Sequence, residues 1–390
     1  MNDRKVCGAP KDNVTRLSVK KKHHTGLRLL ALVCLAAAGL AVWLNWGSIS
    51  PSSAVIAIQA FLGEFGDSKF PVSYSQGSFR DAAALGGDVA VVTDSSLLIY
   101  TDTGLQIAER RHSLSNPRIA ASGGRAVIYD EQGKSLRLES RFSELFSTTL
   151  DYPITAASVN STGTVAAATS SQDYLSELTV FSHTGSQLFK WYCSTGRILS
   201  VAVSPDGQQV AASVISSENG SIKSSVAIYS LSQQTPVAQT DLTGTLIFSL
   251  CYQSNGNIAA LGDNLTAILG SDGSRKATYD YSGKTLRCFC AGLSGTLLVF
   301  SRYGVGQEST LVSLGEGGAV AAQANVKDNI KYIAYDDGVT ALGSTGLKFF
   351  TSKLAPSGST AAAGDILKLL CIRSNAFYFT PATAYQHKIG

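Results

Sequence analysis

Histidine is the side chain that most often binds metals or carries protons, and this chain of 390 residues has few histidines. His23 and His24 lie in a basic N-terminal run, and His112, His183 and His387 are widely separated along the rest of the sequence. Metal sites need clustered nitrogen, oxygen or sulfur donors, and these three histidines show no metal-ligand spacing. The sequence therefore predicts surface or loop histidines and no metal site.

Cysteines could serve as nucleophiles or form disulfides, and five of the seven follow residue 46: Cys193, Cys251, Cys288, Cys290 and Cys371. The last four lie in apolar segments predicted as strands, where a small apolar side chain packs well. Cys288 and Cys290 are too close along one strand to be bridged easily. This pattern favours buried reduced thiols, with a bridge such as Cys251 to Cys288 as the alternative.

No GxSxG elbow, Walker loop, HExxH helix or paired CxxC occurs in the sequence. Several aspartates adjoin glycine without the repeated alternation of a calcium loop, so turn chemistry explains them: Asp206, Asp272, Asp336 and Asp337. Aromatic residues recur near strand ends, where packing between sheets is the expected role and a ligand platform the alternative: Tyr100, Tyr129, Phe181, Tyr229 and Phe350. We expect no catalytic residue, no metal and no cofactor.

The elements that must position any site are clearest in residues 197–242. Val, Ile and Tyr fill short segments there, while Pro, Asp, Gly, Asn and Ser fill the gaps between them. This is the pattern of an antiparallel meander of four strands: Ile198–Val203, Gln209–Ile215, Ser224–Leu231 and Pro236–Asp241. One such sheet cannot bury both of its faces, so copies of it must stack.

The copies are present from residue 70 onward. Each has a turn between its first two strands, centred at Gly87, Gly124, Gly163, Gly207, Gly256, Gly295, Gly338 and Asn375. By subtraction these turns are 37, 39, 44, 49, 39, 43 and 37 residues apart, which is close to the ~40–45-residue period of a four-stranded propeller blade. The sequence predicts an all-β fold: a single β-propeller over residues 70–390, with eight blades favoured. Seven blades remain the alternative, if the terminal copy is a cap.

The last copy is short, with three predicted strands at Ile366–Ile372, Ala376–Thr380 and Ala384–Lys388. An orphan strand, Phe70–Tyr74, precedes the first copy. Adding this N-terminal strand to the last blade would remove an exposed sheet edge and lock the ring. We therefore expect a closing blade built from one N-terminal and three C-terminal strands.

Charge is distributed unevenly along the chain. Residues 1–28 contain eight Lys/Arg and two Asp, which leaves 24 basic and 26 acidic residues, a net charge of −2, for the remainder. A nearly neutral body lacks the clustered cations that bind phosphate backbones, so nucleic acid is not an expected partner. Residues 1–26 are predicted to be a cytoplasmic basic tail.

Leu29–Leu44 is an uninterrupted apolar run, and a helix over residues 27–46 is long enough to cross about 30 Å of hydrocarbon. The predicted membrane anchor includes Leu29, Leu30, Leu32, Leu35, Leu40, Trp43 and Trp46. The topology signal is the group of cations before it: Lys20, Lys21, Lys22 and Arg28. These features predict a single-pass membrane protein with the lipid bilayer as a partner. Its N-terminus would be cytoplasmic and its propeller outside. A cleaved signal peptide, processed near Ser52-Ser53-Ala54, is the alternative.

Residues 47–69 are predicted to be an amphipathic neck, because Ser and Pro open a segment with one apolar stripe. That stripe, at spacings of three and four, is Val55, Ile58, Phe61, Leu62 and Phe65. A short helix packed on the propeller or on the membrane surface is expected. The same stripe could instead be an interface that binds a partner or a second copy.

Three segments carry a family resemblance beyond the overall layout: His112–Pro117, Tyr174–Leu178 and Ser204–Gly207. With the basic tail, single span, neck and Phe70–Val72, the chain resembles a family of bacterial membrane-anchored propellers of unknown function. Its blades are also similar to the WD40-like and quinoprotein-like superfamily, although Trp-Asp signatures and tryptophan docking motifs are missing. The resemblance implies an extracytoplasmic, non-catalytic domain and assigns no active-site residue.

The expected function is therefore a binding or scaffold module of the cell envelope, with an envelope protein or a ligand held at one rim of the propeller. One alternative is an envelope enzyme with a site in the central channel. Another is a sensor that reports a bound ligand through the membrane span. Fold alone does not decide among these functions.

Overall fold

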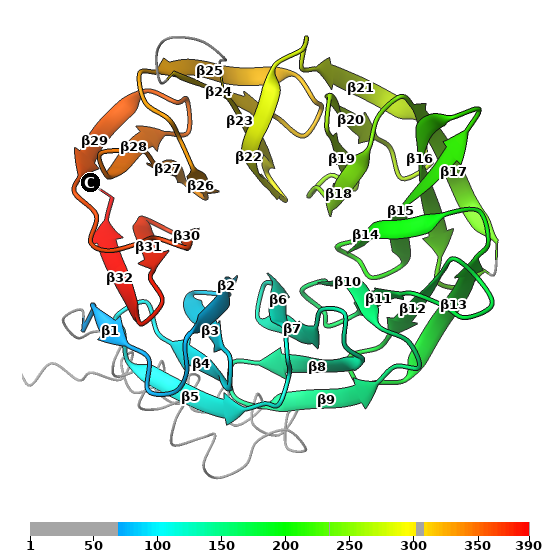
Figure 1. The fold of residues 1–390 in the computed structure, drawn as a ribbon, viewed down its shortest axis with the longest axis horizontal. Helices are drawn as coiled ribbons and strands as arrows, with labels where there is room; N and C mark the ends of the chain where they lie inside the picture. Colours follow the sequence, from blue (N-terminus) through cyan, green and yellow to red (C-terminus); the bar gives the residue numbers. More distant parts are fainter. Residues whose placement is uncertain (1–68, 234, 302–307, 390) are drawn as a thin grey trace, which may run out of the picture. The chain divides into compact units, whose positions relative to one another are not determined.

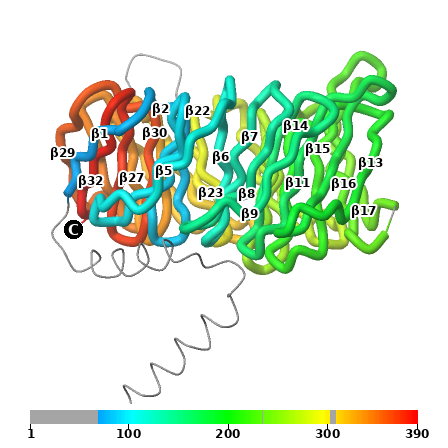
Figure 2. The backbone as a smooth tube through the Cα atoms, turned by 90° about the horizontal axis from the view of Figure 1, so that it is seen from below, coloured from blue at the N-terminus to red at the C-terminus, as the bar shows by residue number. Residues whose placement is uncertain are grey.

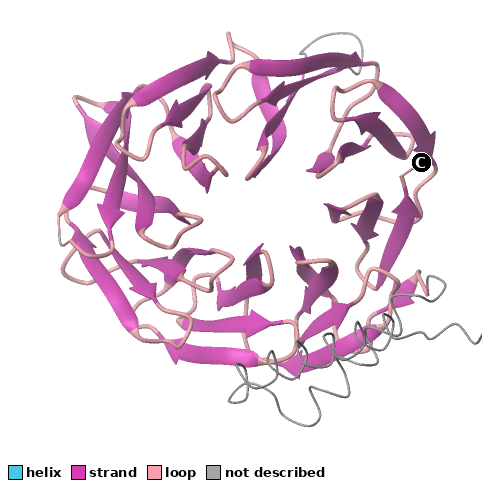
Figure 3. Cartoon of the chain, turned by 180° about the vertical axis from the view of Figure 1, so that it is seen from behind, coloured by secondary structure: helices cyan, strands magenta, loops and turns pink. Residues whose placement is uncertain are grey.

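The computed structural model describes residues 69–233, 235–301 and 308–389, which form eight four-stranded antiparallel sheets around a central channel (Figure 1). The prediction of an eight-bladed all-β propeller is confirmed, and the seven-bladed alternative is wrong. The chain divides into two compact units, Met1–Pro51 and Ser52–Gly390, and every described residue belongs to the second. Throughout the described ranges the chain consists of strands, loops and turns (Figure 3).

The innermost strand of each blade lines the channel, and blades 1 to 8 are numbered here in the order of these strands. They are β2 (Phe79–Leu85), β6 (Pro117–Ser122), β10 (Ile154–Val159), β14 (Arg197–Val203), β18 (Ile247–Tyr252), β22 (Thr285–Gly292), β26 (Tyr332–Tyr335) and β30 (Lys368–Ile372). A register shift near the start of β2, β10, β14, β18 and β22 marks a bulge that leaves one residue unpaired with the next strand.

The second strands are the most buried layer, because each lies between two strands of its own sheet and between two neighbouring blades. Their sequences are accordingly runs of Val, Ala, Ile and Leu rather than alternating patterns. They are β3 (Asp88–Thr93), β7 (Arg125–Asp130), β11 (Val165–Thr169), β15 (Gln209–Glu218), β19 (Ile258–Gly262), β23 (Gly295–Ser301), β27 (Gly338–Leu342) and β31 (Asn375–Phe379).

The third strands continue the core outward, and buried aromatic residues such as Tyr100, Phe181, Tyr229 and Phe350 end or nearly end them. These side chains pack between blades, as predicted. The strands are β4 (Ser96–Tyr100), β8 (Ser135–Ser140), β12 (Ser176–Phe181), β16 (Ser221–Ser230), β20 (Leu265–Leu269), β24 (Ser309–Leu314), β28 (Leu347–Thr351) and β32 (Thr383–Lys388).

The outermost strands have one solvent-facing side, so exposed and partly buried residues alternate along them. They are β5 (Gln106–Arg111), β9 (Glu144–Thr149), β13 (Gln187–Cys193), β17 (Pro236–Thr243), β21 (Arg275–Asp280), β25 (Val320–Val326), β29 (Pro356–Thr360) and β1 (Val72–Ser73). The last is the N-terminal strand, which pairs with β32 and completes blade 8.

The predicted closure by one N-terminal and three C-terminal strands is therefore confirmed, in the order β1-β32-β31-β30. The closing strand, Val72–Ser73, is shorter than the predicted 70–74. It begins after Pro71, which has no N–H to donate to the ladder. Side chains reinforce the seam: the rings of Phe70 and Phe377 lie 5.3 Å apart, and the hydroxyl of Tyr74 donates to the carbonyl of Thr380.

The two faces of the ring differ in which chain turns they carry (Figure 2). The upper face, uppermost in Figure 2, is where the innermost strands begin and where second strands turn into third strands. The lower face carries the turns from first to second and from third to fourth strands. Residue 69 joins the propeller at the lower face, where the Lys69 amide donates to the carbonyl of Thr103 in the β4–β5 turn.

Neighbouring blades are linked by a recurring hydrogen bond near the upper face. A buried serine on the third strand accepts from the backbone N–H at the start of the next innermost strand: Ser176 from Ile198, Ser224 from Ile247, and Ser309 from Ile330. In blade 1 the serine is Ser96 and the corresponding residue is Pro117, which has no N–H. The buried Ser96 hydroxyl consequently has no hydrogen-bond partner among the described residues.

Candidate functional site

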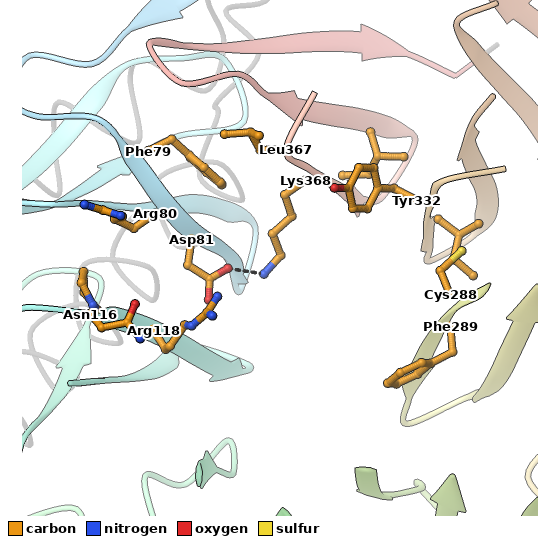
Figure 4. Close-up of a pocket in the computed structure, with 13 residues that line it drawn as sticks. Phe79, Arg80, Asp81, Asn116, Arg118, Cys288, Phe289, Tyr332, Leu367 and Lys368 are labelled. Atoms are coloured by element: carbon orange, nitrogen blue, oxygen red, sulfur yellow. Dashed lines mark hydrogen bonds and ion pairs between the residues drawn. The ribbon is translucent and has the colours of Figure 1, made fainter. Parts of the chain in front are cut away.

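A pocket of about 580 Å³ opens at the upper end of the central channel (Figure 4). It is called the upper-mouth pocket here. Residues at or just before the starts of the innermost strands of blades 1, 2, 7 and 8 form it, together with Cys288 and Phe289 from the middle of the innermost strand of blade 6. Its lining mixes cations, one carboxylate, a carboxamide and apolar groups: Phe79, Arg80, Asp81, Asn116, Pro117, Arg118, Cys288, Phe289, Tyr332, Ile333, Leu367, Lys368 and Leu369. Such a mixture is typical of a binding site.

The other end of the channel differs in chemistry. A second pocket of about 500 Å³ is lined by the ends of the innermost strands of blades 2 to 6 and by the turns that follow them. Its lining consists of Ala, Ser, Val, Leu and other uncharged residues, and Phe289 lines both pockets. All the charge among the lining residues of these two pockets is thus at the upper mouth.

Asp81 is held by three groups from three blades. One carboxylate oxygen accepts from the Ala82 N–H at 2.9 Å and lies 2.5 Å from Lys368 Nζ of blade 8. The other accepts from the Ile119 N–H of blade 2 at 3.2 Å. At the corresponding place in blade 4, Ser200 Oγ accepts from the Leu250 N–H of blade 5 at 3.0 Å. The main role of Asp81 is therefore to link neighbouring blades, and Lys368 neutralises its charge.

Arg118 is the second cation that faces this carboxylate (Figure 4). Its Nε lies 2.9 Å from Glu131 Oε2, which also accepts from the Asn116 side-chain amide at 3.0 Å. The hydrogen bond to Glu131 raises the pKa of Arg118 above its usual value. Its two terminal nitrogens make no hydrogen bond within the described part of the chain, so they are available to a bound group.

Acidic and basic residues of the upper face have different roles. Three aspartates, at the end of a second strand or in the loop that follows it, accept backbone N–H groups just before the innermost strand of their own blade. The pairs are Asp94 with Ser78 at 3.2 Å, Asp130 with Asn116 at 2.7 Å, and Asp263 with Leu246 at 2.9 Å. These carboxylates anchor the strands that form the mouth, which is a structural role.

Basic residues, in contrast, recur where innermost strands begin in six of the eight blades: Arg80, Arg118, Arg197, Arg287, Lys331 and Lys368. All but Lys368 are exposed on this face. The side chains of Arg80, Arg197, Arg287 and Lys331 make neither a hydrogen bond nor an ion pair with any residue that the structure describes. The mouth therefore carries cations whose charge the fold does not use.

The histidines are not brought together. His112 Nδ1 accepts from the Leu114 N–H at 3.3 Å, His183 lies in the β12–β13 turn, and the His387 ring stacks on Phe349 at 4.8 Å. Burial lowers the pKa of His112. Across the described ranges, no group of three or more His, Cys, Asp or Glu side chains could hold a metal ion.

The five described cysteines are free thiols, and four of them lie on innermost strands as predicted. Burial raises the pKa of Cys288 to about 12 and those of Cys251 and Cys371 to about 11. Burial likewise raises the pKa of Cys290. A thiol with a raised pKa is a poor nucleophile at neutral pH, so these side chains serve as small packing groups.

The residues predicted to anchor and orient the protein lie outside the described residues. They are the span (Leu29, Leu30, Leu32, Leu35, Leu40, Trp43, Trp46), the cations before it (Lys20, Lys21, Lys22, Arg28) and the neck stripe (Val55, Ile58, Phe61, Leu62, Phe65). Within residues 69–389, apart from the gaps at 234 and 302–307, there is no helix long and apolar enough to cross a membrane.

Sequence reasoning did not identify the upper-mouth pocket, because its residues are distant in sequence and none belongs to a chemical motif. The sequence nevertheless contained a signal for this pocket. Lys or Arg recurs near the start of predicted first strands, at positions where a propeller core would favour apolar residues. Aligning the blades on their first turns would have brought Arg80, Arg118, Arg287 and Lys368 into one ring.

Solved structures with the same fold include the C-terminal WD40 domain of Sif2, at 15% identity over 83% of this chain and 100% of that one, with a TM-score of 0.60. Sqt1 of Saccharomyces cerevisiae is 11% identical over 83% of this chain and 98% of that one, with a TM-score of 0.58. BamB of Moraxella catarrhalis is 12% identical over 81% of this chain and 100% of that one, with a TM-score of 0.52. At these identities the likeness concerns the fold alone.

No curated protein matches the sequence. A family does: residues 69–381, most of the chain and nearly all of the propeller, match the family of unknown function DUF5711. The match begins just before the closing strand and ends in the last blade, so it covers the ring as one unit. This agrees with the resemblance found in the sequence, and the chain belongs to the DUF5711 family.

Proposed function

We propose that this protein is a membrane-anchored, extracytoplasmic β-propeller that acts as a non-catalytic binding or scaffold module of the cell envelope. The observation that carries the proposal is the upper-mouth pocket, a large opening in a closed ring. Around one opening it presents unused cations such as Arg80 and exposed apolar side chains such as Tyr332 and Leu367. Pockets with a few polar groups on an apolar lining are the usual form of binding sites.

The ring is suited to this task because it fixes the positions of groups that come from five blades. Every sheet is paired on its inner strands, the last sheet is closed by β1, and links such as those of Ser200 and Asp81 join neighbouring blades. A pocket built on such a framework loses little conformational entropy when it binds a partner. Rigid strands with loops at their ends are a common basis for recognition.

The place at which the chain joins the propeller supports the choice of face. Residue 69 lies at the lower face, next to Thr103 in the β4–β5 turn. With the proposed span at residues 27–46 and the proposed neck at 47–69, the anchor would attach on the lower side. The upper mouth lies on the face opposite this junction, and we propose that face as the one that binds partners in the envelope.

An enzymatic function would need a reactive group, and the strongest acid–base pair of the pocket is Asp81 with Lys368. Both oxygens of that carboxylate are engaged by backbone N–H groups and the lysine ammonium. The same inter-blade link is made by Ser200 elsewhere in the ring. A structural role accounts for the pair, so the geometry favours binding over catalysis.

The experiment is a crosslinked pull-down from intact cells with the full-length chain, compared with a control that contains only residues 1–50. The proposal predicts a reproducible partner that is captured by the full-length chain and absent from the control. Equal expression and equal membrane fractionation of the two chains make the comparison valid. Capture of the same proteins by both chains, or of none by either, would contradict the proposed function.

A further inference from the structure

The upper-mouth pocket has an unbalanced charge that points to the chemistry of its partner. Its lining contains Arg80, Arg118 and Lys368 against one carboxylate, Asp81, a net charge of +2 among the lining residues. Glu131, outside the lining, pairs with Arg118 Nε. Next to lining residues in sequence stand two further exposed cations, Arg287 beside Cys288 and Lys331 beside Tyr332.

These cations are not needed by the fold. Asp81, Asp94, Asp130 and Glu131 already accept from backbone N–H groups or from Lys368 and Arg118. Arg80, Arg287 and Lys331, in contrast, have no such partner among the described residues. Grouping like charges around one opening is unfavourable unless an anion relieves the repulsion. The opposite mouth, lined without any charge, shows that the channel can be built from uncharged residues.

Apolar side chains at the same opening narrow the ligand class. Tyr332 is 39% exposed and Leu367 is 40% exposed, and both line the pocket with Lys368 between them in Figure 4. An exposed aromatic and an exposed leucine beside cations favour a ligand with an acidic group next to an apolar one. Guanidinium groups such as those of Arg80 and Arg118 can bind a carboxylate through two hydrogen bonds.

We infer that the upper-mouth pocket binds an acidic segment of another polypeptide, in which Asp or Glu side chains adjoin aromatic or branched apolar ones. This inference rests on the proposed function and names the chemistry of its partner. An anionic lipid surface is less favoured, because the chain joins the ring at the lower face, opposite this pocket. The pocket volume of about 580 Å³ suits a few side chains of a bound segment rather than a single ion.

The test is selection of binders from a library of random short peptides by the full-length chain purified in mild detergent, followed by fluorescence anisotropy with selected peptides. We expect enrichment of Asp and Glu next to Phe, Tyr, Leu or Ile. Arg80→Glu and Lys331→Glu should each weaken binding about tenfold, as is typical when one charged contact is reversed. The affinity should also fall with added salt.

Lys353→Glu is the matched control, because Lys353 is an exposed cation in the β28–β29 turn, at the lower face, and the charge change is the same. It should leave peptide affinity unchanged. Peptides in which Gln replaces Glu should bind much more weakly, and inorganic phosphate should compete poorly. Phosphatidylglycerol vesicles that bind through Arg80, when acidic peptides do not, would overturn the inference in favour of lipid.

The peptide inference would also be overturned if the selected peptides were not enriched in Asp and Glu, or if wild type and Arg80→Glu bound them with equal affinity. The proposed function can fail separately. If the full-length chain captures a partner in cells while acidic peptides do not bind, only the peptide inference is wrong. If no partner is captured and no peptide binds, both are wrong.

Discussion

One carboxylate, that of Asp81, joins three blades at the upper mouth. It accepts N–H groups from Ala82 and Ile119 and pairs with Lys368, and its side chain is 12% exposed. Because these bonds cross the boundaries between blades 8, 1 and 2, the residue stabilises the ring and sets the position of the neighbouring cations. Arg80, one residue earlier, is exposed and makes no such bond among the described residues.

Asp81→Ala should lower the free energy of unfolding by about 2 kcal/mol, since hydrogen bonds to a buried charged group are lost and Lys368 loses its counterion. Asp81→Asn keeps one acceptor and should cost roughly half as much. Arg80→Ala, the neighbouring control, should leave stability unchanged. Urea unfolding followed by tryptophan fluorescence measures all three, and equal stability of Asp81→Ala and wild type would contradict the linking role.

The hydrogen bonds of a second residue, Asp328, lead to a prediction about how the stability of the protein depends on pH. Burial opposes its ionisation, but hydrogen bonds from the Ser344 hydroxyl and N–H outweigh burial and lower its pKa to about 2. Because the folded pKa lies below the unfolded value of 3.8, the carboxylate stabilises the protein above about pH 4. That stabilisation is lost as the pH falls from about 4 toward 2.

Asp328→Asn should therefore be less stable than wild type at pH 7, and the difference should shrink as the pH approaches 2. Unfolding free energies measured at a series of pH values check this directly. A difference that is independent of pH would show that the carboxylate is not stabilised in its charged form. Asp272→Asn, at an exposed turn, provides a comparison at a site where solvent screens the interaction.

Among the elements, the closing strand β1 is the shortest, and the stability of the ring depends on its surroundings. Gly104, in the β4–β5 turn, has φ of +81° and lies against Phe70, so that a Cβ there would come within 3.1 Å of the Phe70 ring. Both the backbone conformation and the close approach require glycine. Gln386 adds a bond across the same seam, donating to the Asp102 carbonyl at 2.8 Å.

Gly104→Ala should destabilise the protein by about 2 kcal/mol, from a left-handed alanine and a displaced Phe70 ring. Gly124→Ala is the matched control, because Gly124 is also next to a strand but a Cβ there meets nothing within 4 Å. It should be neutral or slightly stabilising. Thermal unfolding of the two variants measures the difference, and equal Tm values would contradict the role given to the seam.

Much of the fold at this scale could be predicted from the sequence. Turn glycines at regular spacing, with apolar runs between them, indicated the strands, and eight copies with a short last one indicated the closing blade. The strand ends were less predictable: β15 and β16 extend to Glu218 and Ser221, past the predicted ends, because a tight Asn219-Gly220 turn continues the pairing. Local propensity does not reveal how far a hairpin extends.

The site could not be predicted in the same way. Its side chains come from β2, β6, β22, β26 and β30, which only the closed ring brings together. No spacing in the sequence relates Arg118 to Tyr332, because that relation depends on the number of blades and on the curvature of the ring. Four cysteines lie on innermost strands and Asp206 and Asp272 lie in turns, as predicted, but these patterns left the mouth unidentified.

At the scale of the whole molecule, the proposed topology makes a prediction. The basic residues before the proposed span, such as Lys20 to Lys22, favour a cytoplasmic N-terminus. In a bacterial host, alkaline phosphatase fused after Gly390 should be active, because that enzyme folds only outside the cytoplasm. The same reporter fused after Lys22 should be inactive. Activity at position 22, or none after Gly390, would contradict the topology.

Site-specific photo-crosslinking in intact cells tests most directly whether the upper mouth is the surface that binds the partner. A photoreactive phenylalanine analogue would be placed at Leu367, 40% exposed at the upper mouth, or at Leu293, 51% exposed at the lower mouth. The two variants present the same probe at opposite ends of one channel. A discrete protein adduct from Leu367 and none from Leu293 is the predicted result. An adduct from Leu293 alone would place the partner at the opposite face and contradict the claim.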